Sequence, residues 1–262
     1  MSETPVLLDL FCGAGGAAEG YQRVGFYVVG VDIANQPRYC GDEFIQAAAL
    51  EYLKTADLSR YDAIHASPPC QGYRIMNNLP WLKGREYPLL ILPIMGMLGK
   101  VGKPYVVENV MGARYGAKGL KKRGLEDHGL QAGWLCGTMF GLPFYRHRLF
   151  ATNWFWLAPG HPTHQARIRP GHSLAGRARD IIFTPNRDVH QSFGVRAADA
   201  ALSDWQSNGA QKEGVGIGHA RGWRLAAEAM GIDWMKREEL TQAIPPCYTE
   251  FLGNYLLSVW GV

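Results

Sequence analysis

The sequence lacks both a long hydrophobic run and paired cysteines. No stretch of about 18 consecutive apolar residues occurs, and the N-terminus has no basic segment followed by an apolar one, so we expect neither a membrane span nor a signal peptide. The five cysteines include no Cys-x-x-Cys pair, which argues against a disulfide framework and a structural zinc site. The histidines His161, His164 and His172 have no fourth ligand at a recognisable spacing. We therefore expect a reduced cytoplasmic protein without a bound metal.

Positive charge is present but unevenly distributed. Residues 111–230 contain 16 Lys and Arg against 8 Asp and Glu, a balance of +8, whereas the remainder contains 11 against 15, a balance of −4. Such segregation is typical of nucleic-acid binding, because neutralising phosphates releases counterions and gives affinity for any sequence. A solvated basic face without a partner is the alternative.

Apolar runs alternate with helical patterns along the first half of the chain. This alternation predicts an α/β fold with a mostly parallel sheet covered on both faces, in which ligands collect at the carboxyl ends of the strands. The predicted strands are residues 6–11, 27–31, 63–66 and 105–110, and the predicted helices are residues 17–24, 89–98, 224–230 and 240–260, the last broken at Pro245-Pro246.

The organisation changes in the second half. From Trp154 to Trp223 the sequence is rich in Pro, Gly, His and Arg and has little periodicity. We expect a catalytic and cofactor-binding domain over residues 1–153, a small separate lobe or an extended loop system over residues 154–223, and a C-terminal segment over residues 224–262 that returns to the first domain. A chain of 262 residues is long enough for one sizeable core and such a lobe.

A glycine-rich turn follows the first predicted strand. The glycines of Cys12-Gly13-Ala14-Gly15-Gly16 let the backbone approach a ligand closely, and Asp32, at the end of the next strand, can accept hydrogen bonds from a ribose diol. The spacing differs from the dinucleotide fingerprint GxGxxG. Taken alone, the turn indicates a nucleotide-like cofactor or a plain tight turn.

Cys70 follows a third predicted strand, in the turn Ser67-Pro68-Pro69-Cys70-Gln71. Each proline fixes φ at about −65° and removes a backbone donor, so the pair orients the side chain that follows. An isolated free cysteine is more often buried and inert. The stiffened turn at the end of a strand instead favours a nucleophile.

Five segments occur in one order along the chain. They are Asp9-Leu10-Phe11-Cys12-Gly13-Ala14-Gly15-Gly16, Pro68-Pro69-Cys70-Gln71-Gly72, Glu108-Asn109-Val110, Arg146-His147-Arg148 and Gln242-Ala243-Ile244-Pro245-Pro246. This series resembles the motifs of the cytosine-C5 DNA methyltransferases. The resemblance covers residues 6–150 and 224–258, which is most of the chain outside the basic lobe.

The resemblance implies the Rossmann-like fold of S-adenosylmethionine-dependent methyltransferases, with a small basic target-recognition lobe. S-adenosylmethionine, or a close derivative, would lie over the glycine turn, with Phe11 and Asp57 near the adenine and Asp32 near the ribose. Asp57 rests only on its position after Leu53-Lys54-Thr55-Ala56, and a helix-capping or surface aspartate is the alternative. The implied cofactor-binding residues are Phe11, Gly13, Ala14, Gly15, Gly16, Asp32, Ile33, Asp57, Pro68, Gln242 and Ala243.

The implied catalytic residues are Cys70, Glu108 and Arg148. Carbon 5 of cytosine is a poor nucleophile, so a thiolate adding to carbon 6 converts the ring into an enamine that can attack an electrophilic methyl group. Cys70 would form that bond, and a protonated Glu108 would neutralise ring nitrogen 3. Arg148 would hold the carbonyl at carbon 2, whereas Arg146 braces the turn. A basic pair on a phosphate-binding face is the alternative for both arginines.

The implied partner is double-stranded DNA. A base within a duplex is out of reach of a catalytic cysteine, so the resemblance implies that the cytosine flips into the site. The basic lobe would hold the duplex through phosphate contacts, for which Arg167, Arg169, Arg177, Arg179, Arg187 and Arg196 are the candidates. The implied substrate-binding residues are Gln71, Tyr73, Arg74, Asn109, Arg146, Arg167 and Arg169.

Three positions depart from the family pattern. Arg74 stands where the family has a serine-sized residue, Phe144 where it commonly has glutamine, and Gln242 where it has asparagine. A long cation at Arg74 could contact a DNA phosphate, an anionic group on the donor or base, or solvent. These departures leave open which group is transferred and whether the product is modified further.

Four functions remain in view. We expect a monomeric DNA cytosine-C5 methyltransferase of a restriction-modification or phage type. The alternatives are the same chemistry on tRNA, a catalytically silent DNA-binding regulator on this scaffold, and a pyrimidine-nucleotide modifier. The presence of Cys70, Glu108 and Arg148 argues against the silent regulator, and a nucleotide modifier would have no use for a basic lobe.

Overall fold

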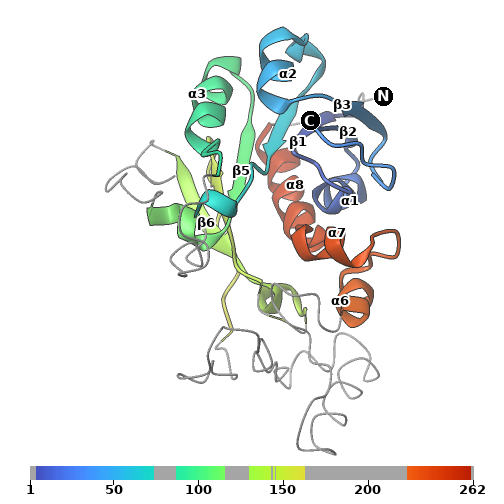
Figure 1. The fold of residues 1–262 in the computed structure, drawn as a ribbon. Helices are drawn as coiled ribbons and strands as arrows, with labels where there is room; N and C mark the ends of the chain where they lie inside the picture. The colour runs from blue at the N-terminus through green and yellow to red at the C-terminus, as the bar shows by residue number, and fades with distance from the viewer. Residues whose placement is uncertain are drawn as a thin grey trace, which may run out of the picture.

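The computed structural model describes residues 4–73, 87–115, 130–142, 144, 146–162 and 223–260 (Figure 1). The predicted lobe over residues 154–223 lies mostly outside these ranges, and so do Arg74, Arg167 and Arg169, together with Arg177, Arg179, Arg187 and Arg196. None of the described helices is both long enough and apolar enough to cross a membrane.

A seven-stranded sheet in the order β3-β2-β1-β4-β5-β7-β6 forms the centre of the fold. The strands β1 to β5 pair in parallel, which confirms the predicted α/β class. The four predicted strands appear within a residue or two of their expected ends, and β3, β6 and β7 were not expected. The bounds are β1 Val6–Leu10, β2 Tyr27–Asp32, β3 Glu43–Gln46, β4 Ala63–Ala66, β5 Tyr105–Asn109, β6 Gln131–Leu135 and β7 Arg148–Thr152.

The strand β7 runs against its neighbours on both sides. It is antiparallel to β5, with Asn109 opposite Leu149, and antiparallel to β6, with Leu135 opposite Arg148. The first residue of β7 therefore lies at the edge of the sheet where the parallel strands end. This reversal brings the segment 146–148 to the carboxyl ends of β4 and β5.

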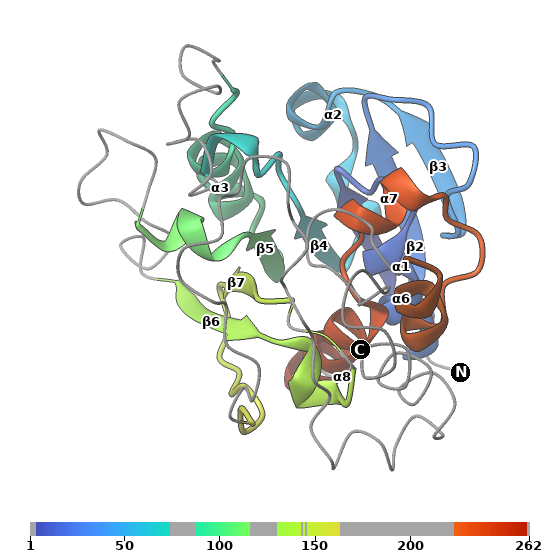
Figure 2. The same ribbon diagram turned by 60° about the horizontal axis from the view of Figure 1, so that its bottom comes forward.

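Helices cover both faces of the sheet (Figure 2). On one face, α2 and α3 pack over a core that includes Leu8, Val29 and Ile64; on the other, α1 and α8 pack over Leu7 and Val28. This alternation along each strand is the consequence of the two-residue repeat of side-chain direction. The helices are α1 Gly16–Arg23, α2 Ala49–Thr55, α3 Ile91–Val101, α6 Trp223–Met230, α7 Arg237–Gln242 and α8 Pro246–Trp260, with 3₁₀ turns at Leu58–Arg60, Gln71–Tyr73, Met111–Tyr115 and Gly137–Phe140.

The close packing of α1 against α8 depends on glycine. A Cβ atom at Gly20 would lie 2.1 Å from the Pro246 carbonyl oxygen, and one at Gly253 would lie 2.6 Å from Val24. The break predicted at Pro245-Pro246 separates α7 from α8, and Pro246 is the first residue of α8, where its missing N–H costs no helical bond. A third apolar cluster joins α6 and α7 to the glycine turn through Ala14.

Candidate active site

The turn that carries Cys70 is held by hydrogen bonds from the strands beside it. The Ser67 amide donates to the Leu10 carbonyl (3.1 Å), and the buried Asn109 amide donates to the Pro68 carbonyl (2.9 Å). The Tyr73 amide closes the turn on the Cys70 carbonyl (3.0 Å). The half-buried Cys70 thiol is thus presented on a fixed backbone at the carboxyl end of β4.

The residues after Cys70 are anchored to α3. Gln71 begins a 3₁₀ turn that ends at Tyr73, whose buried hydroxyl accepts a hydrogen bond from the Ile91 amide (3.1 Å). The anchor holds the prolyl-cysteine turn against the start of that helix.

Glu108 and Arg148 form an ion pair beside this turn. Arg148 Nε lies 2.9 Å from Glu108 Oε1, and the two side chains are 16% and 8% exposed. Burial raises the pKa of Glu108, and the positive charges of Arg148 and Arg146 and a hydrogen bond with Ser67 only partly oppose it. A carboxyl group in this environment can be protonated at higher pH than an exposed glutamate and can then donate a hydrogen bond.

Arg146 is buried between the turn that carries Cys70 and the C-terminal helices. Its Nη2 donates to the Thr241 carbonyl (2.7 Å), and its own carbonyl accepts from the Tyr248 hydroxyl (2.5 Å). Burial and the nearby charge of Arg148 lower the pKa of Arg146 to about 9. The Cys70 thiol interacts electrostatically with this guanidinium, so the buried cation lies beside the turn that carries Cys70.

A buried hydrogen-bonded chain leads from the first helix to Glu108. The Tyr21 hydroxyl is 2.9 Å from His65 Nδ1, His65 Nε2 is 2.8 Å from Ser67 Oγ, and Ser67 bonds Glu108. Burial lowers the pKa of His65 to about 3, so the ring is neutral. The sequence analysis missed this chain; its one signal is a histidine within the otherwise apolar strand 63–66.

The glycine turn leaves open space above a strand-end carboxylate. Phe11 and Gly13 have φ values of 61° and 51°, which bends the chain sharply after β1. The Gly13 amide donates to Asp32 Oδ2 (3.0 Å), and the Ala34 amide donates to Asp32 Oδ1 (2.9 Å). A Cβ atom at Gly13 would meet nothing within 4 Å. Beyond Asp32, the Ile33 side chain is 73% exposed.

The rest of the glycine turn is packed against protein. The Ala14 carbonyl accepts from the Trp234 indole (2.8 Å). A Cβ atom at Gly15 would lie 2.6 Å from Cys40 Sγ, and one at Gly16 would lie 2.6 Å from the Ile244 carbonyl oxygen. Two residues at the end of α7 are predicted to bind the cofactor. Ala243 is buried next to Gly16, and Gln242 is exposed.

Asp57 is not brought to this edge of the sheet. Its carboxylate accepts from the Ser59 amide (2.9 Å) as the cap of a 3₁₀ turn, which matches the helix-capping alternative. The hydrogen bond with Ser59 lowers the pKa of Asp57. Lys103, which precedes β5, bonds the Ser59 carbonyl (3.3 Å), so this turn lies where the strands begin. The neighbour of Asp32 at the carboxyl edge is Gln46, at the end of the unexpected β3.

Asp9 is a buried carboxyl group that interacts electrostatically with both Asp32 and Glu108. Its side chain is fully buried, and within the part of the chain that the structure describes neither carboxyl oxygen has a hydrogen-bond partner. Burial, and the charges of Asp32 and Glu108, raise the pKa of Asp9.

The comparison of sequences finds a methyltransferase. No family model matches the chain. The chain is 23% identical over 221 residues to the type II methyltransferase M.AgeI of Thalassovita gelatinovora, an alignment that covers 75% of this chain. It covers 51% of the other protein, so the chain spans about half the length of the curated relative that it matches.

Two solved structures share the fold. A protein encoded within an E. coli prophage, assigned as a DNA modification methyltransferase, superposes with a TM-score of 0.55 at 15% identity, covering 98% of this chain and 100% of that one. The Dnmt2 methyltransferase of S. pombe has a TM-score of 0.54 at 15% identity, covering 98% and 99%. The chain has a methyltransferase fold. The likeness to methyltransferases that the motifs indicated is confirmed at the level of the fold.

Proposed function

We propose that the chain transfers a methyl group from S-adenosylmethionine to carbon 5 of a cytosine in duplex DNA. The observation that carries the proposal is the grouping of Cys70, the Glu108–Arg148 ion pair and Arg146 at one edge of the sheet. Four side chains with the properties that this chemistry needs are thereby gathered from three separate segments. The likeness to a type II methyltransferase supports the proposal.

The glycine turn and its surroundings fit S-adenosylmethionine. When bound, this cofactor supplies an electrophilic methyl group. Asp32 would hold the ribose, the exposed Ile33 and Phe11 would flank the adenine, and the open space at Gly13 would admit the ligand close to the backbone. Asp57 has no part in this proposal, because its carboxylate caps a turn at the other edge of the sheet.

The side chains beside Cys70 would act on the cytosine ring. The Cys70 thiolate adds to carbon 6 and forms a sulfur–carbon bond. Glu108 in its protonated form donates to nitrogen 3 as the ring gains electrons, and Arg148 binds the oxygen at carbon 2. Transfer of the methyl group to carbon 5 would leave the donor as a neutral thioether. The carbon 5 proton then leaves to water, nitrogen 3 returns its proton to Glu108, and the sulfur–carbon bond breaks to restore the thiolate and the aromatic ring.

The substrate would be a base flipped out of a duplex. Unstacking costs a few kcal/mol, and phosphate contacts by the basic segment 154–223 would offset it. We keep this segment as the proposed target-recognition lobe, the protein as a monomer, and DNA as its partner.

Nucleoside mass spectrometry after incubation with S-adenosylmethionine tests the proposal. Duplex DNA and tRNA are offered separately, and we expect 5-methylcytosine in the DNA alone. Cys70→Ser should abolish transfer while DNA binding stays near that of the native protein, and Cys247→Ser, which changes a thiol in α8, should leave transfer unchanged. Methylation confined to tRNA would establish the RNA alternative, and a native protein that binds DNA without modifying it would establish the silent regulator.

A further inference from the structure

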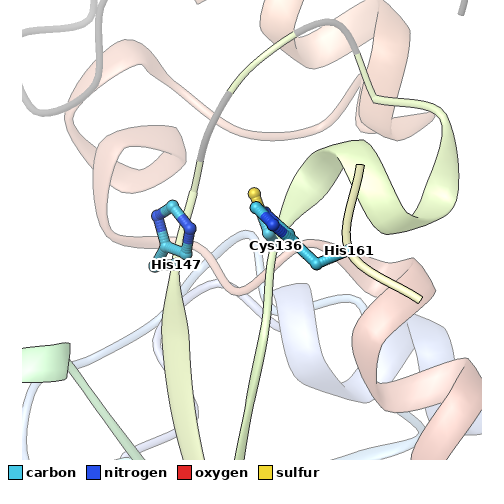
Figure 3. Close-up of side chains that lie close together, drawn as sticks. All are labelled: Cys136, His147 and His161. Atoms are coloured by element: carbon cyan, nitrogen blue, oxygen red, sulfur yellow. The ribbon is translucent and has the colours of Figure 1, made fainter. Parts of the chain in front are cut away.

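Three side chains of the kinds that bind metal ions lie together at the antiparallel end of the sheet, beside β6 and β7. They are Cys136, His147 and His161, and their ligand atoms all lie within 4.8 Å of one another (Figure 3). Cys136 is buried, and the two histidines are half-buried. None of the three belongs to the proposed chemistry at Cys70.

The sheet register explains how the first two residues meet. Leu135, the last residue of β6, pairs with Arg148, the first residue of β7. Cys136 and His147 are the next residue beyond each member of that pair, so the antiparallel ladder places them opposite one another. Eleven and fourteen positions separate the three residues along the chain, a spacing that no zinc motif would reveal.

The Trp134 ring packs against both histidines. Its ring centroid lies 5.2 Å from that of His147 and 4.7 Å from that of His161, and the two imidazole centroids are 5.6 Å apart. The segment after β7 therefore returns over β6 and brings His161 to the other two residues.

The environment of Cys136 suits a thiolate ligand. The Thr138 hydroxyl donates to its sulfur (3.3 Å), and the Met139 amide also donates to the Cys136 side chain at the start of the 3₁₀ turn. Hydrogen bonds to the sulfur of a metal-bound cysteine stabilise its negative charge and fix its direction. The fold thus already supplies hydrogen-bond donors to the Cys136 sulfur.

A small cavity opens next to the cluster. Its volume is about 280 Å³, and Trp134, Met139 and His161 are among its lining residues. An ion can therefore approach the cluster from the surface, and the cavity can hold a further donor such as water.

We propose that Cys136, His147 and His161 bind one Zn²⁺ ion. One thiolate and two imidazoles are ligands that zinc prefers over oxygen-seeking cations, and three protein ligands leave the fourth tetrahedral position for water. Donor atoms around a zinc ion lie about 3.5 Å apart. The three ligand atoms, which lie within 4.8 Å of one another, would therefore have to move about 1 Å closer together on binding the ion. This proposal stands independently of methyl transfer. His147 lies between Arg146 and Arg148, so the ion would also fix the turn that presents both arginines.

Metal analysis of the purified full chain tests the site. After growth with zinc and gel filtration, elemental analysis should find close to one zinc per chain. Cys136→Ser and His161→Ala should each bind Zn²⁺ at least ten times more weakly in a competition with a chromogenic chelator, whereas Cys247→Ser should bind it as the native protein does. Zinc binding that is equally tight in all three variants, or absent from the native protein, would overturn the proposal.

Cobalt substitution gives a readout that does not depend on the variants folding. Co²⁺ added to the metal-free native chain should produce a thiolate-to-cobalt charge-transfer band and intense visible bands of four-coordinate geometry, which Zn²⁺ then bleaches. A spectrum of weak octahedral bands without the charge-transfer band would show that Cys136 is no ligand. Circular dichroism of each variant separates loss of the ion from loss of the fold.

Discussion

The parallel part of the sheet and its antiparallel corner contribute to the site in different ways. In the parallel part, β3-β2-β1-β4-β5, the candidate groups Asp32, Cys70 and Glu108 lie at or just beyond the carboxyl ends of strands. In the antiparallel corner, β7 and β6, Arg146 and Arg148 stand at the start of a strand, and Cys136 follows one. Under the proposed function, the first part would place the ligand and the second would supply positive charge to it.

The two parts meet in a single buried ion pair. Glu108 belongs to β5 and Arg148 to β7, and the antiparallel register between these strands makes them neighbours. Removing one partner of a buried pair leaves the other charge uncompensated, which costs about 3–5 kcal/mol. This junction is therefore where a substitution should have the largest effect.

Glu108→Gln should slow the chemical step by more than tenfold, and by about 10²-fold if Glu108 acts as a full general acid. The amide keeps the shape of the side chain but cannot transfer a proton to nitrogen 3. Single-turnover methylation of duplex DNA measures the step. Glu43→Gln, which breaks the exposed pair with Arg60, is the matched control and should leave the rate unchanged. If Glu108→Gln reacts at the native rate, the arginines of the antiparallel corner stabilise the ring without help from Glu108 in β5.

Asn109→Ala should loosen the turn that carries Cys70. The buried amide bonds the Pro68 carbonyl and the Val110 amide, and its loss should lower both the turnover rate and the free energy of unfolding, the latter by about 2 kcal/mol. Asn153→Ala is the control, because Asn153 bonds the Tyr105 amide and the Lys103 carbonyl at the opposite end of β5. It should lower stability alone. Equal turnover in the two variants would show that Cys70 does not depend on Asn109.

The parallel part was largely predictable from sequence. Near-continuous apolar runs such as Val6–Leu10 and Tyr105–Asn109 mark strands buried on both faces, and residues that directly follow such runs must gather at one edge. The Cys70 turn and the Asp32 carboxylate both follow from this rule. Asp57 did not follow it, because it precedes a strand instead of ending one.

The antiparallel corner could not be predicted in the same way. The strand Gln131–Leu135 contains a glycine and only one fully buried residue, so its pattern is too weak to mark a strand. The segment 146–148 was recognised only through its resemblance to a family motif. The position of this segment, and the meeting of Cys136 with His147, depend on the register between strands that are distant in the chain. Local sequence does not encode such a register.

Gly13→Ala tests whether the open space over the glycine turn is the cofactor site. The positive φ of 51° should cost the variant about 1–2 kcal/mol of stability. Gly25→Ala is the matched control, since Gly25 also has a positive φ and open space around it but lies after α1. Calorimetry should find S-adenosylmethionine binding at least tenfold weaker in Gly13→Ala, and unchanged in Gly25→Ala. Equal affinities would place the cofactor elsewhere.

The smallest effect concerns His65, which lies in the parallel part but bonds toward the junction. Its pKa is about 3 in the folded chain against 6.5 for an ordinary histidine, so below pH 6.5 the unfolded chain takes up a proton that the folded chain does not. Its contribution to stability is therefore full above this pH and decreases as the pH falls toward 3. Between about pH 7 and about pH 5.5 the native protein should lose about 1 kcal/mol more than His65→Asn, measured by urea unfolding. Parallel curves for the two proteins would mean that His65 is charged in the fold, and the neutral chain from Tyr21 to Glu108 would then be wrong.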